Sequence, residues 1–290
     1  MKTARSPIFT HFNYKISLAF SALLFCLTFS QLAGAVSFSQ GDLAKRSLTP
    51  LQLEIEKQRQ RLSSSEVEER RDAVMRLGAL RHPDASRVAV SALADTAAIV
   101  RATASGALLW LPAEEGAVAL LPLLGDKDDF VRQEAAYAMG RTKSKIAVAP
   151  LVALLAKDKQ DGVRGAAVVA LGQIADEAAV VPLAQVLSPQ TSLRGGKART
   201  EKNPFLLRAA AVSLGQIGSR AGLPALVAAL EDETTTDDVR REAARALGII
   251  GDPAAEPALR KVLMARDAYL SFAAHEALGR ISRRQTGRPG

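Results

Sequence analysis

The stretch that decides the fold is VRQEAAYAMG, residues 131–140, because variants of it recur along the chain. Its apolar residues follow the period of an α-helix, so Val131, Ala135 and Met139 fall on one side of that helix. Gly140 comes last and predicts the end of the helix, since glycine adopts the left-handed conformation at low cost. The stretch therefore predicts a short amphipathic helix that ends at Gly140.

The same pattern occurs seven times, which makes an internal repeat the main organising feature of the sequence. The final residues of successive copies are 31, 31, 32, 43, 33 and 31 positions apart. Seven copies at a nearly constant step indicate a chain built from one structural unit. The copies are 69–78, 100–109, 131–140, 163–172, 206–215, 239–248 and 270–279.

A second apolar run follows four of the copies, and a proline stands near the start of each run. Proline is tolerated in the first turn of a helix, where the N–H groups have no helical partner. Asp176 and Asp252 precede two of the runs as predicted N-caps. Each repeat is therefore predicted to form a first helix, a short turn and a second helix. The runs are 147–156, 179–188, 221–230 and 254–263, with Pro150, Pro182, Pro224 and Pro257.

The composition agrees with an all-α protein. Of the 290 residues, 48% are hydrophobic and only 4% are aromatic, while alanine and leucine are abundant. Such a chain is too hydrophobic to be wholly disordered, and it is rich in good helix formers. A single cysteine, Cys26, excludes a disulfide framework and a multi-cysteine zinc site.

The repeat resembles the HEAT repeat through three elements, D-x5-R, V-R-x-x-A-A-x-A-L-G and A-x-x-P-L. It is most similar to the short HEAT-like type of phycobilisome lyases and many bacterial proteins. The resemblance covers residues 50–285 and implies a right-handed α-solenoid of about seven helical hairpins. The shared residues pack one repeat on the next, so they imply a fold and no particular function.

An aspartate precedes an arginine by six residues in three of the copies. In HEAT-like stacks such side chains commonly form a ladder between repeats, so the resemblance implies a structural role for them. The sixth copy keeps Arg240 but lacks the aspartate, and the ladder is expected to weaken after the third pair. The predicted ladder residues are Asp95, Arg101, Asp126, Arg132, Asp158, Arg164 and Arg240.

The first 35 residues have the order of a secretory signal peptide. A basic segment precedes an apolar run at 16–29, and the cleavage motif Ala33-x-Ala35 follows. The run is shorter than the roughly 20 apolar residues of a membrane span. Cleavage before Val36 is therefore expected, with export to the bacterial periplasm. The alternative is an uncleaved anchor over 16–36 that holds the protein at the inner membrane.

Four segments depart from the repeat. Residues 36–49 are polar and are interpreted as a linker, while 50–62 are predicted to form a helix that covers the first repeat. The 43-residue step contains a loop insertion at 188–203 with turn-forming residues. The basic tail, 286–290, follows the last repeat.

Four residues are candidates for partner binding. Arg194, Lys197 and Arg199 lie in the insertion, which is either a solvated loop or a contact for an anionic partner. Trp110 is either a core aromatic or an exposed interface anchor, since tryptophan is enriched where binding energy concentrates.

No catalytic residue, metal site or cofactor is predicted, and the chain is not expected to be an enzyme. Outside the signal peptide it has two histidines, whereas a zinc site or a catalytic triad needs several converging groups. The HEAT-like deoxyhypusine hydroxylases bind two irons through repeated His-Glu pairs, and this chain has one such pair, His275-Glu276. Nucleic acid is not the expected partner, because aromatic residues for base stacking are few.

These observations predict an exported scaffold that docks another protein on the concave face of a solenoid. We expect the second helices to line that face. The net charge of +8 would suit a partner with an acidic surface. One alternative is a membrane-tethered scaffold held by the N-terminal anchor, the one case in which the chain would contact a membrane. Another is an accessory lyase or chaperone-like factor that acts on a modified protein.

Overall fold

The computed structural model describes residues 48–188, 192–194, 197–199 and 203–286, with the backbone alone between 192 and 199. The predicted signal peptide, residues 36–47 of the predicted linker and residues 287–290 of the tail lie outside the described residues. The chain divides into two compact units, 1–54 and 55–290, and the second holds all the repeats.

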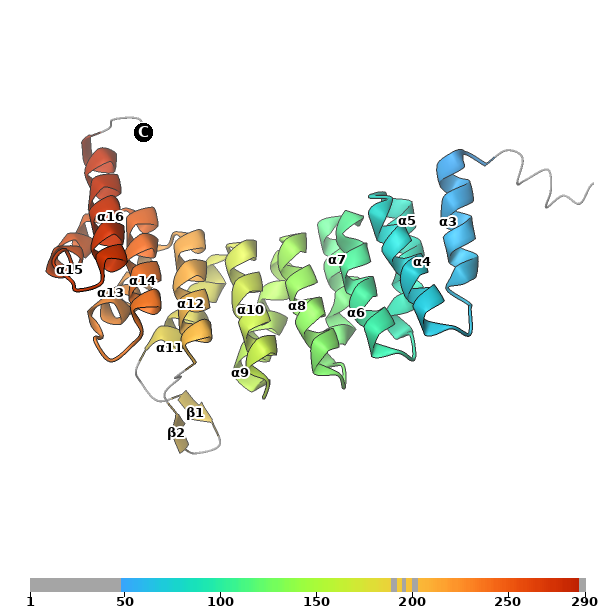
Figure 1. Cartoon of the computed structure of the whole chain (residues 1–290), viewed down its shortest axis with the longest axis horizontal. Helices are drawn as coiled ribbons and strands as arrows, with labels where there is room; N and C mark the ends of the chain where they lie inside the picture. The colour runs from blue at the N-terminus through green and yellow to red at the C-terminus, as the bar shows by residue number, and fades with distance from the viewer. Residues whose placement is uncertain (1–47, 189–191, 195–196, 200–202, 287–290) are drawn as a thin grey trace, which may run out of the picture. The chain divides into compact units, whose positions relative to one another are not determined.

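Each of the first six copies forms a helical hairpin, and these hairpins stack in one row (Figure 1). The seventh copy forms α16 (Ala268–Thr286), which closes the row within the described part of the chain. The other first helices are α4 (Val67–Ala79), α6 (Ala98–Ala107), α8 (Asp129–Thr142), α10 (Asp161–Ile174), α12 (Pro204–Ile217) and α14 (Asp237–Ile250).

The second helices are shorter, and each is joined to its first helix by a tight turn. Short 3₁₀ segments extend some of them, including η1 (Val90–Ala94) after α5 and η3 (Leu121–Gly125) after α7, while η2 (Leu108–Trp110) continues the first helix α6. A single helix, α3 (Pro50–Arg61), precedes the repeats, where the sequence predicts a capping helix. The second helices are α5 (Pro83–Ala89), α7 (Ala113–Leu120), α9 (Val148–Lys157), α11 (Val180–Leu187), α13 (Leu223–Glu231) and α15 (Glu256–Lys261).

The N-caps are confirmed, but the predicted C-cap is wrong. Asp176 and Asp252 accept hydrogen bonds from the backbone N–H two residues ahead, each at 2.9 Å. Gly140 lies inside α8, and the left-handed residue that ends the helix is Lys143, with φ of 57°. In α12 the same position is Gly218, with φ of 74°. The helix therefore ends three residues beyond the repeat glycine.

The repeat glycine serves close packing between first helices. A Cβ on Gly140 would lie 2.5 Å from the Cα of Ala170 in α10, and one on Gly248 would lie 2.7 Å from the Cα of Ala277. These contacts involve backbone, so a side chain there cannot be accommodated by a rotamer change. Glycine and alanine at the contact let neighbouring first helices approach closely.

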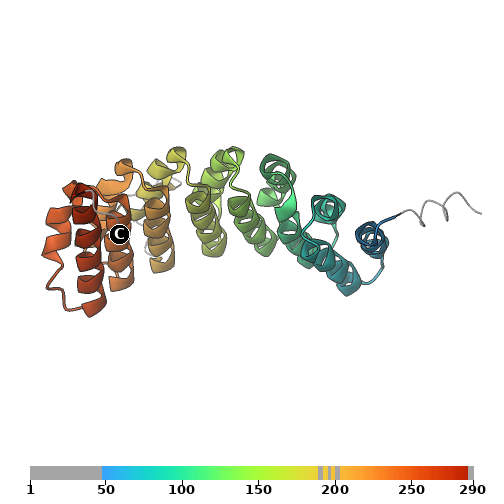
Figure 2. The same ribbon diagram turned by 90° about the horizontal axis from the view of Figure 1, so that it is seen from above.

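The first helices pack directly on one another along the row, whereas the second helices meet their neighbours more sparingly. Figure 2 shows the two layers at right angles to the view of Figure 1. Within residues 55–286, the closer spacing places the first helices on the inner side of the bend in the stack. The expectation that second helices line the concave face is therefore wrong. We call the exposed side of the first helices the inner face.

The core lies between the two layers and is built from leucine, valine and alanine. Leu151, Leu171 and Leu214 are fully buried. A few buried hydroxyl groups join the elements as well, since Ser213 in α12 donates to the carbonyl oxygen of Val168 in α10 at 2.9 Å. This bond satisfies a buried polar group, whose isolation would be costly.

The insertion contains a short antiparallel hairpin in place of the predicted loop. Strand β1 (Ser192–Arg194) pairs with β2 (Lys197–Arg199), and Leu193 stands opposite Ala198. Its backbone therefore has regular pairing at a point where composition alone indicates turns. Among the helices that the structure describes, none has both the length and the apolar character of a membrane span.

Candidate functional site

Ion pairs between arginine and aspartate join successive repeats. Arg101 in α6 donates from Nε and Nη2 to the two carboxylate oxygens of Asp126 in the next repeat, each at 2.7 Å. Its Nη1 donates to the backbone carbonyl of Asp95 at 2.9 Å. Only 8% of the Arg101 side chain and 10% of that of Asp126 are exposed. The hydrogen bonds from Arg101 lower the pKa of Asp126.

Two further pairs repeat this geometry. Arg70 bonds both carboxylate oxygens of Asp95, at 2.7 and 2.8 Å, and Arg132 bonds those of Asp158 at 2.7 and 3.2 Å. The carboxylate partner lies 25 or 26 residues ahead of the arginine. The aspartate six residues before Arg132 supplies its backbone carbonyl instead. Each arginine thus connects two repeats.

The two remaining predicted ladder arginines make other contacts. Arg164 donates to the carbonyl oxygen of Leu155 and to Asp161. The next copy begins later because of the insertion, and the residue that corresponds there to Asp158 is Glu201, which lies outside the described residues.

The prediction for Arg240 is wrong. Arg240 donates to the carbonyl oxygen of Leu230 at 3.0 Å. The inter-repeat pair is made by the next residue, Arg241, whose Nε lies 2.8 Å from Oδ1 of Asp267. Helix α16, formed by the seventh copy, begins one residue after Asp267. Asp267 is the only aspartate of the turn before α16, and it lies opposite Arg241 instead of Arg240.

The candidate partner-binding residues do not gather at one described site. Trp110 ends η2 with 42% of its surface exposed, and the Arg81 guanidinium lies 5.7 Å from its ring centroid. This position favours the surface interpretation, because Leu108 of the same turn fills the core. The side chains of Arg194, Lys197 and Arg199 lie outside the described residues.

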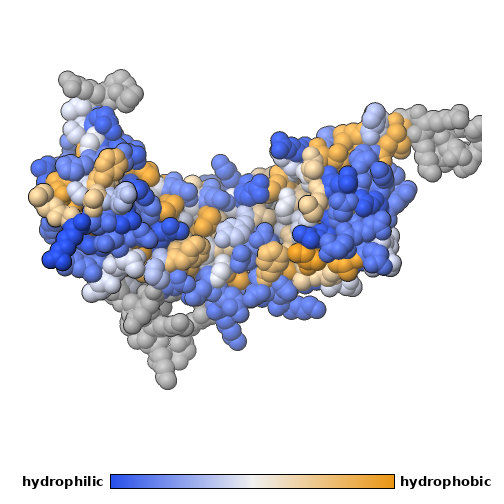
Figure 3. Space-filling model, viewed as in Figure 1, coloured by the Kyte–Doolittle hydropathy of each residue, from blue (hydrophilic) through white to orange (hydrophobic). Residues whose placement is uncertain are grey.

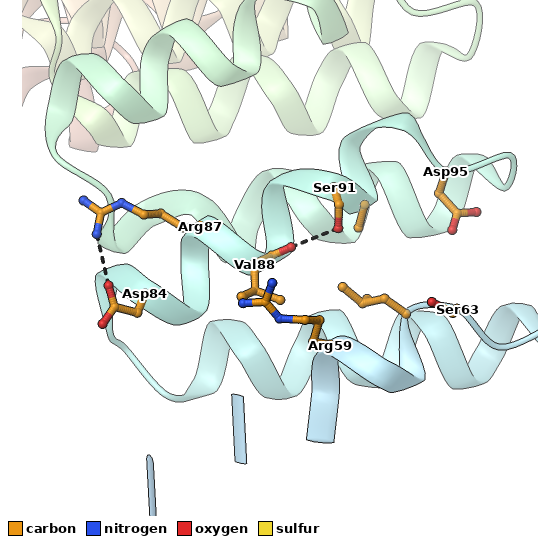
Figure 4. Close-up of a pocket in the computed structure, with 9 residues that line it drawn as sticks. Arg59, Ser63, Asp84, Arg87, Val88, Ser91 and Asp95 are labelled. Atoms are coloured by element: carbon orange, nitrogen blue, oxygen red, sulfur yellow. Dashed lines mark hydrogen bonds and ion pairs between the residues drawn. The ribbon is translucent and has the colours of Figure 1, made fainter. Parts of the chain in front are cut away.

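A pocket of about 780 Å³ lies between the end of α3 and the helix α5 with η1 (Figure 4). Arg59 from α3 and Arg87 from α5 flank an apolar patch that includes Val88 (Figure 4). Arg59 pairs with Glu56 at 3.2 Å, and Arg87 pairs with Asp84 and Glu115. Because these arginines already have carboxylate partners, the pocket offers no strong preference for a charged ligand.

In four of the seven copies the inner face carries an apolar side chain three residues before the last residue of the copy, whereas the other three copies hold Gly106, Arg245 and Glu276 there. Val212 is 37% exposed and Met75 is 55% exposed, while Tyr137 and Val169 are partly exposed. Figure 3 shows this side of the molecule as mainly hydrophilic, with apolar patches between the charged side chains. An apolar strip on a preformed surface is suited to contact with another protein.

A second feature of the inner face is a pocket of about 280 Å³ formed by α12, α14 and α16. It combines three arginines, two acids and one tyrosine. These residues are not predicted from the sequence, because the repeat pattern marks the packed positions and leaves outward positions unspecified. The signal that could have found them is the charged residues at outward positions of the sixth copy, such as Arg245 where the third to fifth copies have Tyr137, Val169 and Val212. The lining residues are Arg208, Asp238, Arg241, Glu242, Arg245 and Tyr269.

In the described residues no three His, Cys, Asp or Glu side chains gather as metal ligands. His82 caps the start of α5, where its Nδ1 accepts a hydrogen bond from the N–H of Asp84 at 3.2 Å. His275 is exposed on α16. The inner face offers apolar contacts and charged side chains to a ligand.

Stacked helical hairpins with a continuous core define an α-solenoid. The family model of HEAT repeats matches residues 55–140, 117–199 and 197–279, which together cover more than half of the chain. The protein therefore belongs to the HEAT-repeat family. No curated protein matches the chain in sequence.

Solved structures with a similar fold include an engineered protein at 24% identity, with a TM-score of 0.51, covering 79% of this chain and 68% of that one. The CpcE and CpcF complex of phycocyanin lyase from Nostoc sp. is 22% identical with a TM-score of 0.48, covering 79% and 93%. Human deoxyhypusine hydroxylase is 19% identical with a TM-score of 0.38, covering 80% and 97%. At these identities the likeness concerns the fold alone.

Proposed function

We propose that this protein is a scaffold that binds another protein on the inner face of its solenoid. The observation that carries the proposal is the strip of exposed or partly exposed apolar side chains at one repeat position in four copies, Met75, Tyr137, Val169 and Val212. The residues that build the fold do not require apolar side chains there, because these positions point away from the core. Partner contact gives them a role.

The way the stack is held together supports this proposal. Buried ion pairs such as Arg101–Asp126 and close helix contacts such as Gly140–Ala170 fix neighbouring repeats against one another. A surface that is ordered before binding loses little conformational entropy when the partner arrives. In this proposal the chain itself catalyses no reaction.

We further propose that the scaffold works outside the cytoplasm, in the periplasm of a bacterium. This part rests on the basic segment, the apolar run and the Ala33-x-Ala35 motif of the first 35 residues. An uncleaved anchor at the inner membrane is the second candidate, and the same sequence segment supports it.

The proposal is tested by capture of native partners with matched surface variants. Val212→Lys places a charge on the inner face, while Val181→Lys places the same charge on α11, where the valine is 62% exposed. We expect a partner captured by the wild type to be retained by Val181→Lys and lost by Val212→Lys. Circular dichroism checks that both variants fold. A partner that both folded variants retain equally would contradict binding on the inner face.

A further inference from the structure

We propose that the pocket between α12, α14 and α16 receives an acidic side chain of an extended partner segment, with Arg208 as its anchor. The inference rests on the proposed function and names the chemistry of the partner. The segment carries apolar residues beside the acidic one, and these lie along the strip of the inner face.

The arginines of the pocket differ in what they already bind. Arg241 is held by Asp267 and by Asp238, whose Oδ1 lies 2.8 Å from Nη1 of the arginine. Arg245 donates to Glu242 at 2.6 Å. Arg208 is exposed and has no hydrogen-bond or ion-pair partner among the residues that the structure describes. Its guanidinium therefore keeps all its donors available to a ligand in the pocket.

The pocket is shaped for one side chain. The Arg241 guanidinium lies 5.2 Å from the ring centroid of Tyr269, so cation–π contact holds this wall in place. Tyr269 is 68% exposed, and its ring offers an apolar surface to the methylene groups of a ligand. A guanidinium beside an aromatic wall can bind a carboxylate through two parallel hydrogen bonds, which favours glutamate or aspartate.

The surroundings favour an isolated acid over a polyanion. Asp238 and Glu242 line the same pocket and would repel a second negative charge close to the first. On α12 the strip begins at Val212, one helical turn beyond Arg208, and Val169 holds the equivalent position on α10. A nucleic acid carries a negative charge at every phosphate and would meet these acids repeatedly, whereas a protein segment can combine one acid with apolar side chains.

The spacing of the helices sets the pattern of the segment. Packed helices lie about 8–10 Å apart, and an extended chain advances about 3.3 Å per residue. Side chains roughly three residues apart therefore meet equivalent positions on successive first helices. The pocket extends from α12 to α14 and α16, so the acidic residue of the segment lies over α14 while Arg208 reaches it from α12. The expected pattern is this acidic residue followed by apolar residues at intervals of about three, which reach Val212, Val169 and Tyr137 in turn.

The test uses a fluorescein-labelled synthetic peptide with one glutamate and leucines at the third, sixth and ninth positions after it, spaced by glycine and serine. A matched peptide has glutamine in place of the glutamate. Fluorescence anisotropy with the whole protein measures both affinities. We expect the glutamate peptide to bind about tenfold more tightly, because a charge-assisted pair replaces a neutral one. The preference should shrink as salt is added.

The variant Arg208→Gln should bind the two peptides equally. The control is Arg141→Gln, which changes another exposed arginine of the first-helix layer outside the pocket. It should keep the tenfold preference. Equal binding of both peptides by the wild type, a preference that survives Arg208→Gln, or no binding of either peptide would overturn the proposal. So would a labelled oligonucleotide that binds in competition with the peptide through Arg208. The Val212 capture experiment judges the scaffold function independently of these results.

Discussion

A single arginine can connect two repeats because its guanidinium has five donors in a fixed plane. In Arg101, Nη1 serves a backbone carbonyl of its own repeat while Nε and Nη2 hold the carboxylate of Asp126. Lysine could not replace it, since an ammonium group cannot make two parallel hydrogen bonds to one carboxylate. The repeat therefore depends on the shape of this side chain as well as on its charge.

The ladder makes stability depend on pH in a defined direction. The pKa of Asp126 is lowered by its hydrogen bonds from Arg101, so the pair stabilises the fold above the unfolded pKa of about 3.9. That contribution is lost as pH falls through the lower pKa of the folded state. We expect Asp126→Asn to reduce the free energy of unfolding at pH 7 by about 2 kcal/mol. Urea unfolding at pH 7 and pH 3 measures it.

The loss in unfolding free energy caused by Asp126→Asn should be smaller at pH 3, because the wild type has begun to lose the same interaction there. The control is Asp84→Asn, which alters an exposed pair with Arg87 and should change stability little. An equal loss in unfolding free energy at both pH values would show that Asp126 does not act through its charge.

Sequence could locate the ladder residues in part. The spacing of six between Asp95 and Arg101 is visible in the sequence, but it reflects a bond to a backbone carbonyl. The carboxylate partner depends on how the next repeat stacks, which spacing within one copy does not contain. Arg208 was missed for a related reason, because an outward side chain leaves no periodic trace.

At the scale of the element, a glycine near the end of an apolar run can have either of two roles. It can end the helix as a C-cap, or it can allow close contact with a neighbouring helix. Glycine near the end of an apolar run indicates a C-cap, yet Gly140 lies within α8 and faces the backbone of α10. The helices themselves follow directly from the period of apolar residues. Their ends and contacts could not be predicted, because both depend on a neighbouring helix far away in the sequence.

The packing role of Gly140 predicts opposite outcomes for two glycine substitutions. Gly140→Ala forces a Cβ against the Cα of Ala170, and we expect it to destabilise the fold by about 1–3 kcal/mol. Gly106 lies in α6 with open space around its position, so Gly106→Ala should stabilise the fold by about 0.5–1 kcal/mol. Denaturant unfolding of both variants checks this. Destabilisation by both substitutions would point to a general intolerance of alanine and not to packing.

At the scale of the molecule, stability is close to a sum of repeat and neighbour terms, since each repeat contacts mainly the next. The sequence predicts this architecture well, because one repeated pattern determines every unit. The prediction that the second helices line the inner face is wrong, because the direction of curvature depends on which of the two helix layers packs more closely.

The expected export predicts a defined mature chain. If the first 35 residues are a cleaved signal peptide, protein purified from the envelope of its native host begins at Val36. Intact-mass spectrometry of the purified protein measures the N-terminus. The control is Ala35→Leu, which removes the small residue at the cleavage site and should leave the chain at full length. A wild-type chain of full length in the membrane fraction would favour the anchored alternative.

The ladder also bears on where this protein could change its length during evolution. Between α10 and α12 the extra residues come before Asn203, and the neighbouring helices are still joined by bonds such as Asn203 to Asp161 and Ser213 to Val168. Residues inserted at that place leave these bonds in register. An insertion between Asp126 and the first residue of α8 would instead separate Asp126 from the helix that packs on α6. The one long step of the repeat thus falls at a joint where duplication or insertion of sequence can be tolerated.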